Sequence, residues 1–218
     1  MRVVAIDGPA GAGKSTIAQL LADRLGVPYL DTGAMYRAVT FAALRDGVDT
    51  RNEGEVAALA QKTRIELSPG RVVVDGADVT AEIRTQRINA AVSHVAALSG
   101  VRSILRNAQR LWVESRGGGV VEGRDIGTVV FPDATLKVFL TARPEVRARR
   151  RVAESGGDVD EIARAIAERD RLDSTRSDSP LATAADSIQF DTSDLTIDQV
   201  VDDLHRMVIE KERINGRG

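Results

Sequence analysis

The sequence contains no cysteine, which excludes disulfide bonds, thiolate catalysis and cysteine-ligated metal centres. Aromatic residues are scarce: one Trp, two Tyr and four Phe are too few to favour a surface that stacks against nucleic-acid bases. The charge also has no large excess of either sign, with 30 basic against 32 acidic residues. A balanced charge disfavours bulk binding of nucleic acid.

Long hydrophobic runs are missing as well. No apolar stretch reaches the ~18 residues of a membrane-spanning helix, and a strand-like pattern begins at once at the N-terminus, without a signal peptide. We therefore expect a cytoplasmic protein. The apolar fraction of 43% still suffices for a core, and 218 residues suit one α/β domain with an insertion.

A glycine-rich stretch organises the chain: Gly8-Pro9-Ala10-Gly11-Ala12-Gly13-Lys14-Ser15-Thr16. It matches G-x-x-x-x-G-K-[ST], the phosphate-binding loop (P-loop), which requires a strand before it and a helix after it. The apolar run 2–6 and the helical spacing of Ile17 and Leu21 predict both. The alternative is a strand-to-helix turn that binds nothing. Only four of the 30 basic residues are lysines, which disfavours a lysine here by composition alone.

The P-loop predicts a nucleoside triphosphate as ligand. Its backbone N–H groups and the positive end of the following helix would point at phosphates. Lys14 would reach the outer phosphates as a point charge, and the Ser15 hydroxyl would bind Mg²⁺. The loop does not specify which reaction follows.

The rest of the pattern predicts a parallel α/β core. Short strands are expected at 27–30, 120–121, 135–140 and 187–190. Between residue 46 and about 85 the pattern instead predicts a helix and short antiparallel strands at 65–67, 72–75 and 78–80. This insertion is either a plain structural excursion or a cover over a substrate.

Several polar positions have two interpretations each. Thr32 is expected to cap a helix that carries Tyr36 and Arg37 near its start. A cation there opposes the helix dipole, so Arg37 is either a solvated surface residue or the partner of a bound anion. Arg124 and Asp125 follow the strand at 120–121, where doubly wound sheets bind ligands, although a plain ion pair is the alternative.

Three predicted helices carry further polar groups. One face of the helix at 100–115 is either solvated or a wall for a polar ligand, and it holds Arg102, Arg106 and Gln109. A helix opened by Pro144 holds an arginine cluster that is either a solvated face or an anion partner: Arg147, Arg149, Arg150 and Arg151. In the helix that follows, the spacing i, i+4, i+7 aligns Arg169, Asp173 and Arg176, provided that the helix extends that far.

Arginines scattered around a triphosphate site suit phosphoryl transfer, because the transition state spreads charge over the phosphoryl oxygens. The chain has no Asn-Lys-x-Asp motif, which argues against a GTPase. Its two histidines, His94 and His205, lie in helical pattern and form no convincing Ser-His-Asp set.

From residue 3 to about 208 the chain resembles the bacterial cytidylate kinases, a branch of the P-loop nucleoside monophosphate kinases. The loop motif at 6–16 is shared by many kinases, whereas Gly-Arg-Asp-Ile-Gly-Thr-Val-Val-Phe-Pro-Asp-Ala at 123–134 is far more specific. The other matching segments are 30–37, 82–85, Glu168-Arg169-Asp170, Asp173, Arg176 and Pro180-Leu181.

The resemblance implies transfer of the γ-phosphate of ATP to CMP or dCMP with Mg²⁺, and it implies roles for several of the matching residues. Arg37, Arg124 and Arg169 would hold the monophosphate. Ser93, Arg102 and Arg176 would read the cytosine edge, with support from Asp125, and Asp173 would bind the ribose. Thr32 and Tyr36 complete the CMP set. ATP would bind at Gly8–Thr16, the metal at Ser15, and the expected catalytic residues are Lys14, Arg124, Arg147 and Arg151.

The fold implied is the three-layer P-loop NTPase fold, with a parallel central sheet, an antiparallel substrate-side insertion and a helical lid. The expected division is a core at 1–45, 117–143 and 177–212, a substrate-binding region at 46–116, a lid at 144–176 and a loose tail at 213–218. We expect a monomer without nucleic-acid or membrane partners. Glu122 keeps a carboxylate where some relatives have aspartate, and its role stays open.

Two other functions remain open. The chain is alternatively another small P-loop kinase, acting on UMP, AMP or a non-nucleotide alcohol. It is otherwise a nucleotide-dependent switch without catalysis, which would bind ATP but release no ADP in response to an acceptor.

Overall fold

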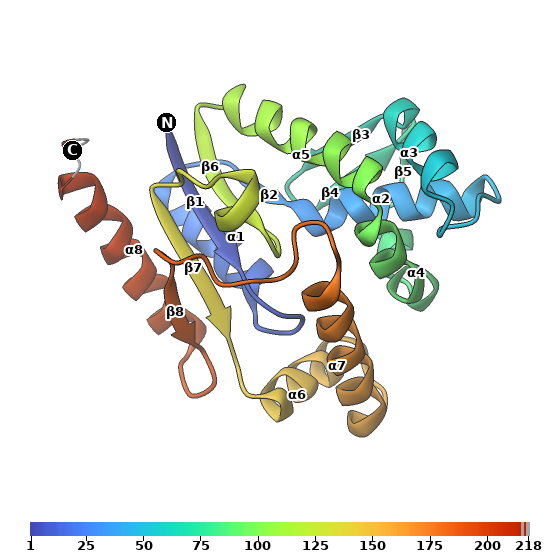
Figure 1. Cartoon of the computed structure of the whole chain (residues 1–218). Helices are drawn as coiled ribbons and strands as arrows, with labels where there is room; N and C mark the ends of the chain where they lie inside the picture. Colours follow the sequence, from blue (N-terminus) through green and yellow to red (C-terminus); the bar gives the residue numbers. More distant parts are fainter. Residues whose placement is uncertain (215, 217–218) are drawn as a thin grey trace. The chain divides into compact units, whose positions relative to one another are not determined.

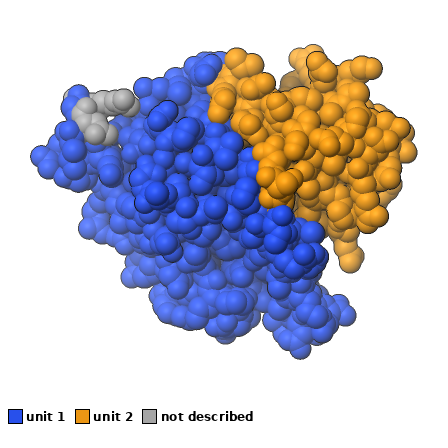
Figure 2. Space-filling model, viewed as in Figure 1, with its two compact units in different colours: residues 1–30, 113–175, 179–218 blue, residues 31–112, 176–178 orange. Residues whose placement is uncertain are grey.

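The computed structural model describes residues 1–214 and 216, and Figure 1 traces its helices and strands. The chain forms two compact units, coloured separately in Figure 2. Unit 1 comprises Met1–Leu30, Val113–Thr175 and Ser179–Gly218, and unit 2 comprises Asp31–Trp112 and Arg176–Asp178. The predicted division into core, substrate-binding region and lid has other bounds and stays a prediction.

Unit 1 is built on a five-stranded sheet with the order β2-β6-β1-β7-β8. Its strands are β1 (Arg2–Asp7), β2 (Tyr29–Asp31), β6 (Gly118–Glu122), β7 (Leu136–Thr141) and β8 (Ile188–Asp191). β1 pairs in parallel with β6 and β7, and β7 pairs in parallel with β8. Parallel strands are covered on both faces, which explains the continuous apolar runs of β1 and β7. The predicted parallel core is confirmed.

The helices of unit 1 bury their apolar stripes in the same core. They are α1 (Lys14–Leu25), α6 (Pro144–Ser155), α7 (Val159–Thr175) and α8 (Ile197–Ile214), with a π-helical turn at Ile126–Val130. Leu21 of α1 and Leu204 of α8 pack with Ile6 of β1 and Leu140 of β7. This packing fixes the start of α1 beside the end of β1, where the P-loop lies (Figure 1).

Unit 2 has a second, smaller core. Its elements are α2 (Thr32–Arg45), α3 (Glu53–Lys62), β3 (Ile65–Ser68), β4 (Arg71–Val74), β5 (Ala77–Asp78), a 3₁₀ turn (Glu82–Arg84), α4 (Gln86–Ala97) and α5 (Ser99–Glu114), whose last two residues belong to unit 1. β3, β4 and β5 form the predicted antiparallel sheet. Val72 and Val74 of β4 pack on Ala38 and Ala42 of α2, so α2 folds with the insertion.

Two local predictions are wrong. Asp31, and not Thr32, caps α2: its carboxylate accepts the N–H of Ala34 at 2.9 Å, while Thr32 is the buried first residue of the helix. α8 continues to Ile214, so residues 213–214 are helical and not part of a tail. Gly216 lies in a turn, and the remaining tail positions 215 and 217–218 lie outside the described residues.

The alignment of Arg176 with Arg169 and Asp173 required a longer helix, and α7 ends at Thr175, so it does not carry Arg176. Pro180 restricts the residue before it to non-helical backbone, and Ser179 adopts a positive φ of 51°. The segment Arg176–Asp178 belongs to unit 2 instead, where Asp178 pairs with Arg106.

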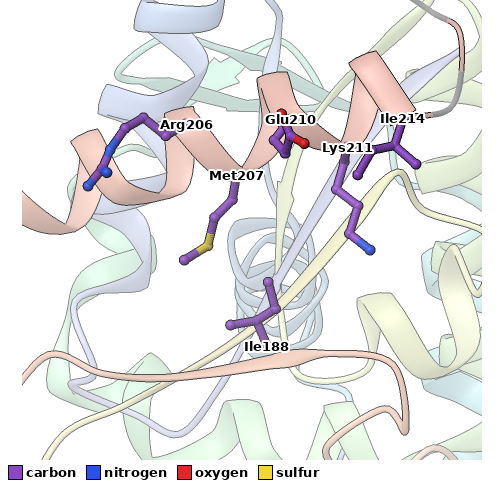
Figure 3. A pocket seen from close by; sticks show the side chains of 6 residues that line it. All are labelled: Ile188, Arg206, Met207, Glu210, Lys211 and Ile214. Carbon is purple, nitrogen blue, oxygen red and sulfur yellow. The ribbon is translucent and has the colours of Figure 1, made fainter.

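Within residues 1–214 and 216, no single helix has both the length and the apolar composition of a membrane span; α4 and α5 meet these criteria only as a pair bent by 94°. A pocket of about 290 Å³ lies between β8 and α8, where Met207 points toward Ile188 (Figure 3). Arg206, Glu210 and Lys211 also line it. None of these side chains was predicted to belong to a functional site.

Candidate active site

The P-loop is shaped by glycines that no other residue replaces easily. At Gly8, with a φ of 147°, a Cβ would lie 2.1 Å from the carbonyl oxygen of Leu140 in β7. Only glycine therefore lets the chain leave β1 so close to the neighbouring strand. Gly13, with a φ of 84°, stands at the N-cap of α1 without a side-chain cap. The N–H groups at this helix start are thus suited to an anion, and Ser15 lies exposed beside them.

Lys14 is buried in positively charged surroundings. Its Nζ donates to the carbonyl oxygen of Pro9 at 2.7 Å. Burial and the nearby charge of Arg124, with a smaller effect from Arg169, lower the pKa of Lys14 to about 7, although the carboxylate of Glu122 acts in the opposite direction. A bound phosphate would supply negative charge and raise this pKa again. The electrostatics at Lys14 therefore favour an anionic ligand.

Glu122, whose role the sequence left open, is the last residue of β6 and pairs in register with Ile6 of β1. It is 4% exposed and accepts a hydrogen bond from the hydroxyl of Tyr29 in β2. Its negative charge favours the protonated form of Lys14 and so raises the pKa of that residue. Glu122 thus belongs to the electrostatic surroundings of the P-loop lysine.

Arg124 pairs with Asp173, and not with the neighbouring Asp125. Its Nε donates to Oδ2 of Asp173 at 2.8 Å, and Nη1 donates to the carbonyl oxygen of Gly123 at 3.2 Å. Burial has the largest single effect and would lower the pKa of Arg124, but the charge and hydrogen bond of Asp173, together with the charges of Asp170 and Glu122, raise that pKa on balance. The structure thus brings together two residues that the resemblance assigns to adjacent parts of CMP. Asp125 is buried at 5% exposure.

Asp7 is a buried residue that the sequence analysis did not select. Its carboxylate accepts the N–H groups of Ile126 at 2.8 Å and Gly127 at 2.7 Å, in the turn directly after Asp125. Burial raises its pKa to about 6, against the effect of these hydrogen bonds. An acidic residue at the end of an apolar strand was the available signal. Asp7 links the start of the P-loop to the segment that carries Arg124.

Two arginines of the α6 cluster contact the P-loop or its surroundings. Nη1 of Arg147 donates to the carbonyl oxygen of Ala10 at 3.0 Å. Arg150 donates to Oγ1 of Thr192 at 2.9 Å and to its carbonyl oxygen at 2.7 Å, and Thr192 lies directly after β8. For these two arginines the solvated-face interpretation is wrong.

The other two arginines of the cluster make contacts within α6. Nε of Arg149 donates to the carbonyl oxygen of Glu145 at 3.3 Å. Arg151, an expected catalytic residue, pairs with Glu154 at 3.0 Å, and its side chain is 39% exposed. The structure therefore brings Arg147, and not Arg151, into contact with the P-loop.

In unit 2 the predicted base-reading residue Arg102 is 1% exposed. Its guanidinium carbon lies 5.6 Å from the centre of the Tyr36 ring, and its Nε lies 3.7 Å from Oδ1 of Asp178. Arg106 reaches the same oxygen at 3.3 Å. Gln109 is buried as well, so the solvated interpretation of this face of α5 is wrong.

The other predicted residues of unit 2 lie on separate elements. Arg37 of α2 donates from Nη1 to the carbonyl oxygen of Ile83 at 2.9 Å. Ser93 lies partly exposed on α4, and Arg176 lies in the short segment that rejoins unit 2. Unit 2 thus holds Thr32, Tyr36, Arg37, Ser93, Arg102 and Arg176, whereas unit 1 holds Gly8–Thr16, Arg124, Asp125, Arg147, Arg151, Arg169 and Asp173.

No group of three or more His, Asp or Glu that could hold a metal ion occurs in the described part of the chain. An Mg²⁺ ion that is bound with a nucleotide takes most of its ligands from phosphates and water. The exposed Ser15 hydroxyl at the start of α1 is the protein group that suits it.

A parallel sheet, a P-loop between its central strand and α1, and buried cations around Lys14 define a P-loop phosphotransferase. The fold is shared with two solved structures. One is an uncharacterized protein from Eubacterium ventriosum, with a TM-score of 0.52 and 12% identity over 95% of this chain and 98% of that chain. The other is a Thermus thermophilus protein, with a TM-score of 0.52 and 17% identity over 96% and 97%.

Sequence comparison is more specific. The profile of the cytidylate kinase family matches residues 4–210. Cytidylate kinases with high similarity come from Streptomyces avermitilis (48% identity, 96% of this chain and 93% of the relative), Limosilactobacillus fermentum (50%, 92% of each) and Mycobacterium leprae (47%, 97% and 96%). The chain belongs to the cytidylate kinase family, which confirms the resemblance.

Proposed function

We propose that this protein transfers the γ-phosphate of ATP to CMP, giving ADP and CDP. The observation that carries the proposal is Lys14 at the end of the P-loop, whose pKa is lowered first by burial and then by the charges of Arg124 and Arg169. Phosphoryl transfer brings two anionic substrates together and spreads charge over the transferred group, so it needs such a cationic centre.

On the donor side, we assign the phosphates of ATP to the P-loop residues Gly8–Thr16. The open N-terminus of α1 suits the β-phosphate, and Lys14 suits the outer phosphates. Ser15 would hold Mg²⁺, which supplies neutralisation of phosphate charge when bound. The positive φ angles of Gly11 and Gly13 support this assignment, because left-handed residues are a feature of backbone loops that bind anions.

On the acceptor side, Arg37, Arg124 and Arg169 are assigned to the monophosphate of CMP, and Asp173 to its ribose. The bond between Arg124 and Asp173 supports their assignment to neighbouring groups of one nucleotide.

We assign the cytosine edge to Ser93, Arg102 and Arg176, with Thr32, Tyr36 and Asp125 in support. The ring of Tyr36 and the carboxylate of Asp178 hold Arg102 in place. A guanidinium held in this way suits discrimination by hydrogen bonds, which rejects a base with the wrong edge more strongly than an apolar pocket does.

The reaction needs no general base, because the attacking phosphate oxygen is ionised at neutral pH. Catalysis then consists of in-line positioning and neutralisation by Lys14, Arg124 and the lid arginines. The contact of Arg147 with the P-loop supports its catalytic assignment. The assignment of Arg151 rests on the family resemblance.

The proposal also includes a second acceptor, the location of the protein, its oligomeric state and its partners. dCMP is a second acceptor, and the protein is a cytoplasmic monomer without nucleic-acid or membrane partners. The balanced charge and the seven aromatic residues support the absence of a nucleic-acid partner.

The test is ADP release with Mg·ATP in the presence of CMP, dCMP, UMP, AMP, GMP or shikimate, with an acceptor-free reaction as the control. We expect turnover with CMP and dCMP. Turnover with UMP or AMP instead would keep the reaction and overturn the base-reading residues. ATP binding without acceptor-dependent ADP release would favour the nucleotide switch.

A further inference from the structure

We propose that Asp170 of α7 is a positioning residue for phosphoryl transfer, which holds Arg147 in place against the P-loop. This inference rests on the proposed function and adds to it a residue without an assigned role. It concerns residues of unit 1 alone: Ala10 of the P-loop, Arg147 of α6 and Asp170 of α7.

The two side chains bind both polar groups of one P-loop residue. Oδ1 of Asp170 accepts the N–H of Ala10 at 3.0 Å, and Nη1 of Arg147 donates to the carbonyl oxygen of Ala10 at 3.0 Å. The same Nη1 of Arg147 also pairs with Oδ2 of Asp170. Ala10 is thus fixed from both sides by opposite charges that also bind each other.

The contact extends to the backbone. A Cβ at Gly11 would lie 3.1 Å from Cβ of Arg147 and 3.2 Å from its carbonyl oxygen, so α6 itself lies against the P-loop. Nε of Arg147 donates to the carbonyl oxygen of Ala142 at 3.1 Å. The guanidinium is therefore held on both edges, by Ala142 on one and by Ala10 and Asp170 on the other.

The pair is shielded from solvent, which makes it stronger than an ordinary surface pair. The side chains of Arg147 and Asp170 are 11% and 18% exposed. Glu168, two residues earlier in α7, offers a contrast: it pairs with Arg171 at 2.7 Å, but these two side chains are 56% and 60% exposed. Exposed pairs of that kind contribute little, because water and salt screen them. Glu168 is therefore a matched control for loss of a carboxylate on the same helix.

The functional consequence follows from the geometry of Arg147. A cation that stabilises the transferring phosphoryl group must be in place before the reaction, and an error on the order of 1 Å costs roughly 10²-fold in rate. Without the carboxylate, Arg147 keeps two carbonyl acceptors but loses the charged partner that selects its position. We expect the loss in kcat, because Arg147 contacts the donor loop and has no assigned role in holding CMP.

The test compares Asp170→Asn with Glu168→Gln. Asparagine keeps an oxygen that can accept the N–H of Ala10, but it is uncharged and directs an amide group at Arg147. We expect kcat for CMP phosphorylation to fall by roughly 10- to 100-fold in Asp170→Asn, with little change in the KM for CMP. Glu168→Gln retains the wild-type kcat, because its pair lies in solvent.

A double-mutant cycle with Arg147→Ala separates positioning from a general structural effect. If Asp170 acts through Arg147, adding Asp170→Asn to Arg147→Ala produces no further loss in kcat. Should Asp170→Asn not fold, Asp170→Glu takes its place: the charge is kept but displaced by one methylene, and the loss should again disappear in the Arg147→Ala background.

Three results would overturn the inference: an unchanged kcat in Asp170→Asn, a change confined to the KM for CMP, or losses that add fully in the double variant. In each case an active wild type leaves the proposed function intact. A wild type that phosphorylates none of the acceptors would instead overturn the proposed function.

Discussion

The two units treat buried positive charge in opposite ways. In unit 1, Lys14 is buried beside Arg124, so its pKa falls to about 7. In unit 2, Arg102 is just as buried, but the Tyr36 ring and the Asp178 carboxylate offset its charge. The amine of Lys14 in unit 1 thus donates to a neutral carbonyl oxygen, whereas the guanidinium of Arg102 in unit 2 lies 3.7 Å from a carboxylate.

This difference separates two kinds of recognition. Burial disfavours the protonated form of Lys14, and a bound anion stabilises that form. The Lys14 region is therefore suited to phosphates. A guanidinium that is already compensated gains little from an added charge, but its position is fixed, which suits hydrogen bonds to a neutral base. The following variants test this division.

The largest effect is expected for Lys14→Met. We expect a loss in kcat of about 10³-fold, because the variant removes a preorganised cation from the phosphoryl site. The free energy of unfolding should stay within about 1 kcal/mol of wild type, because the lost hydrogen bond to Pro9 is offset by removal of a buried amine. Steady-state kinetics and denaturant unfolding measure the two quantities. A large loss of stability would contradict the view that burial disfavours the protonated form of Lys14.

An intermediate effect is expected for Arg176→Ala. We expect kcat/KM for CMP to fall by on the order of 10²-fold, because the variant removes the guanidinium that is assigned to hydrogen bonds with the base. ATP binding should be nearly unchanged. Titration of ATP into the variant and kinetics with CMP provide the two measurements, and Arg171→Ala, an exposed substitution in the preceding helix, is the control. Equal losses in ATP binding and CMP use would refute the assigned role.

The features that could be predicted from the sequence are local in the chain. The P-loop, the parallel strands and the antiparallel strands of the insertion follow from spacing and turn residues. The contacts that define the candidate site are not local: Asp7 binds N–H groups 119 and 120 residues away. Spacing alone gives no signal for such pairs.

Two open points of the sequence analysis were decided by tertiary partners. Helical spacing aligned Arg176 with Asp173 only if the helix extended that far, but Asp178 pairs with Arg102 and Arg106 of α5, and the segment belongs to unit 2. The face of α5 was interpreted as either solvated or a wall for a polar ligand, and the burial of Arg102 and Gln109 excludes the solvated interpretation. In both cases tertiary partners decided the outcome, and a pattern of residue types does not identify them.

The smallest effect is a pH dependence of ATP binding. Below pH 7, Lys14 is already protonated in the free protein and nucleotide binding requires no further proton there. Above pH 7 it is neutral, and a bound triphosphate must draw a proton onto it, so ATP affinity should fall by up to about tenfold per pH unit. The charged groups that act on the amine are Arg124, Glu122, Arg169 and Asp173.

Calorimetric titration of ATP at pH 8 in buffers of different ionisation enthalpy measures the proton uptake directly. We expect uptake by the wild type, and none by Lys14→Met, which otherwise presents the same loop. The stability of the folded protein changes with pH in the opposite direction to ATP affinity. From pH 7 toward the ordinary lysine pKa of 10.5, the unfolded chain holds a proton that the folded protein lacks, so the Lys14 contribution to stability rises with pH. ATP affinity that stays constant above pH 7 would show that Lys14 is charged before the nucleotide binds, and the contrast between the two units would then be lost.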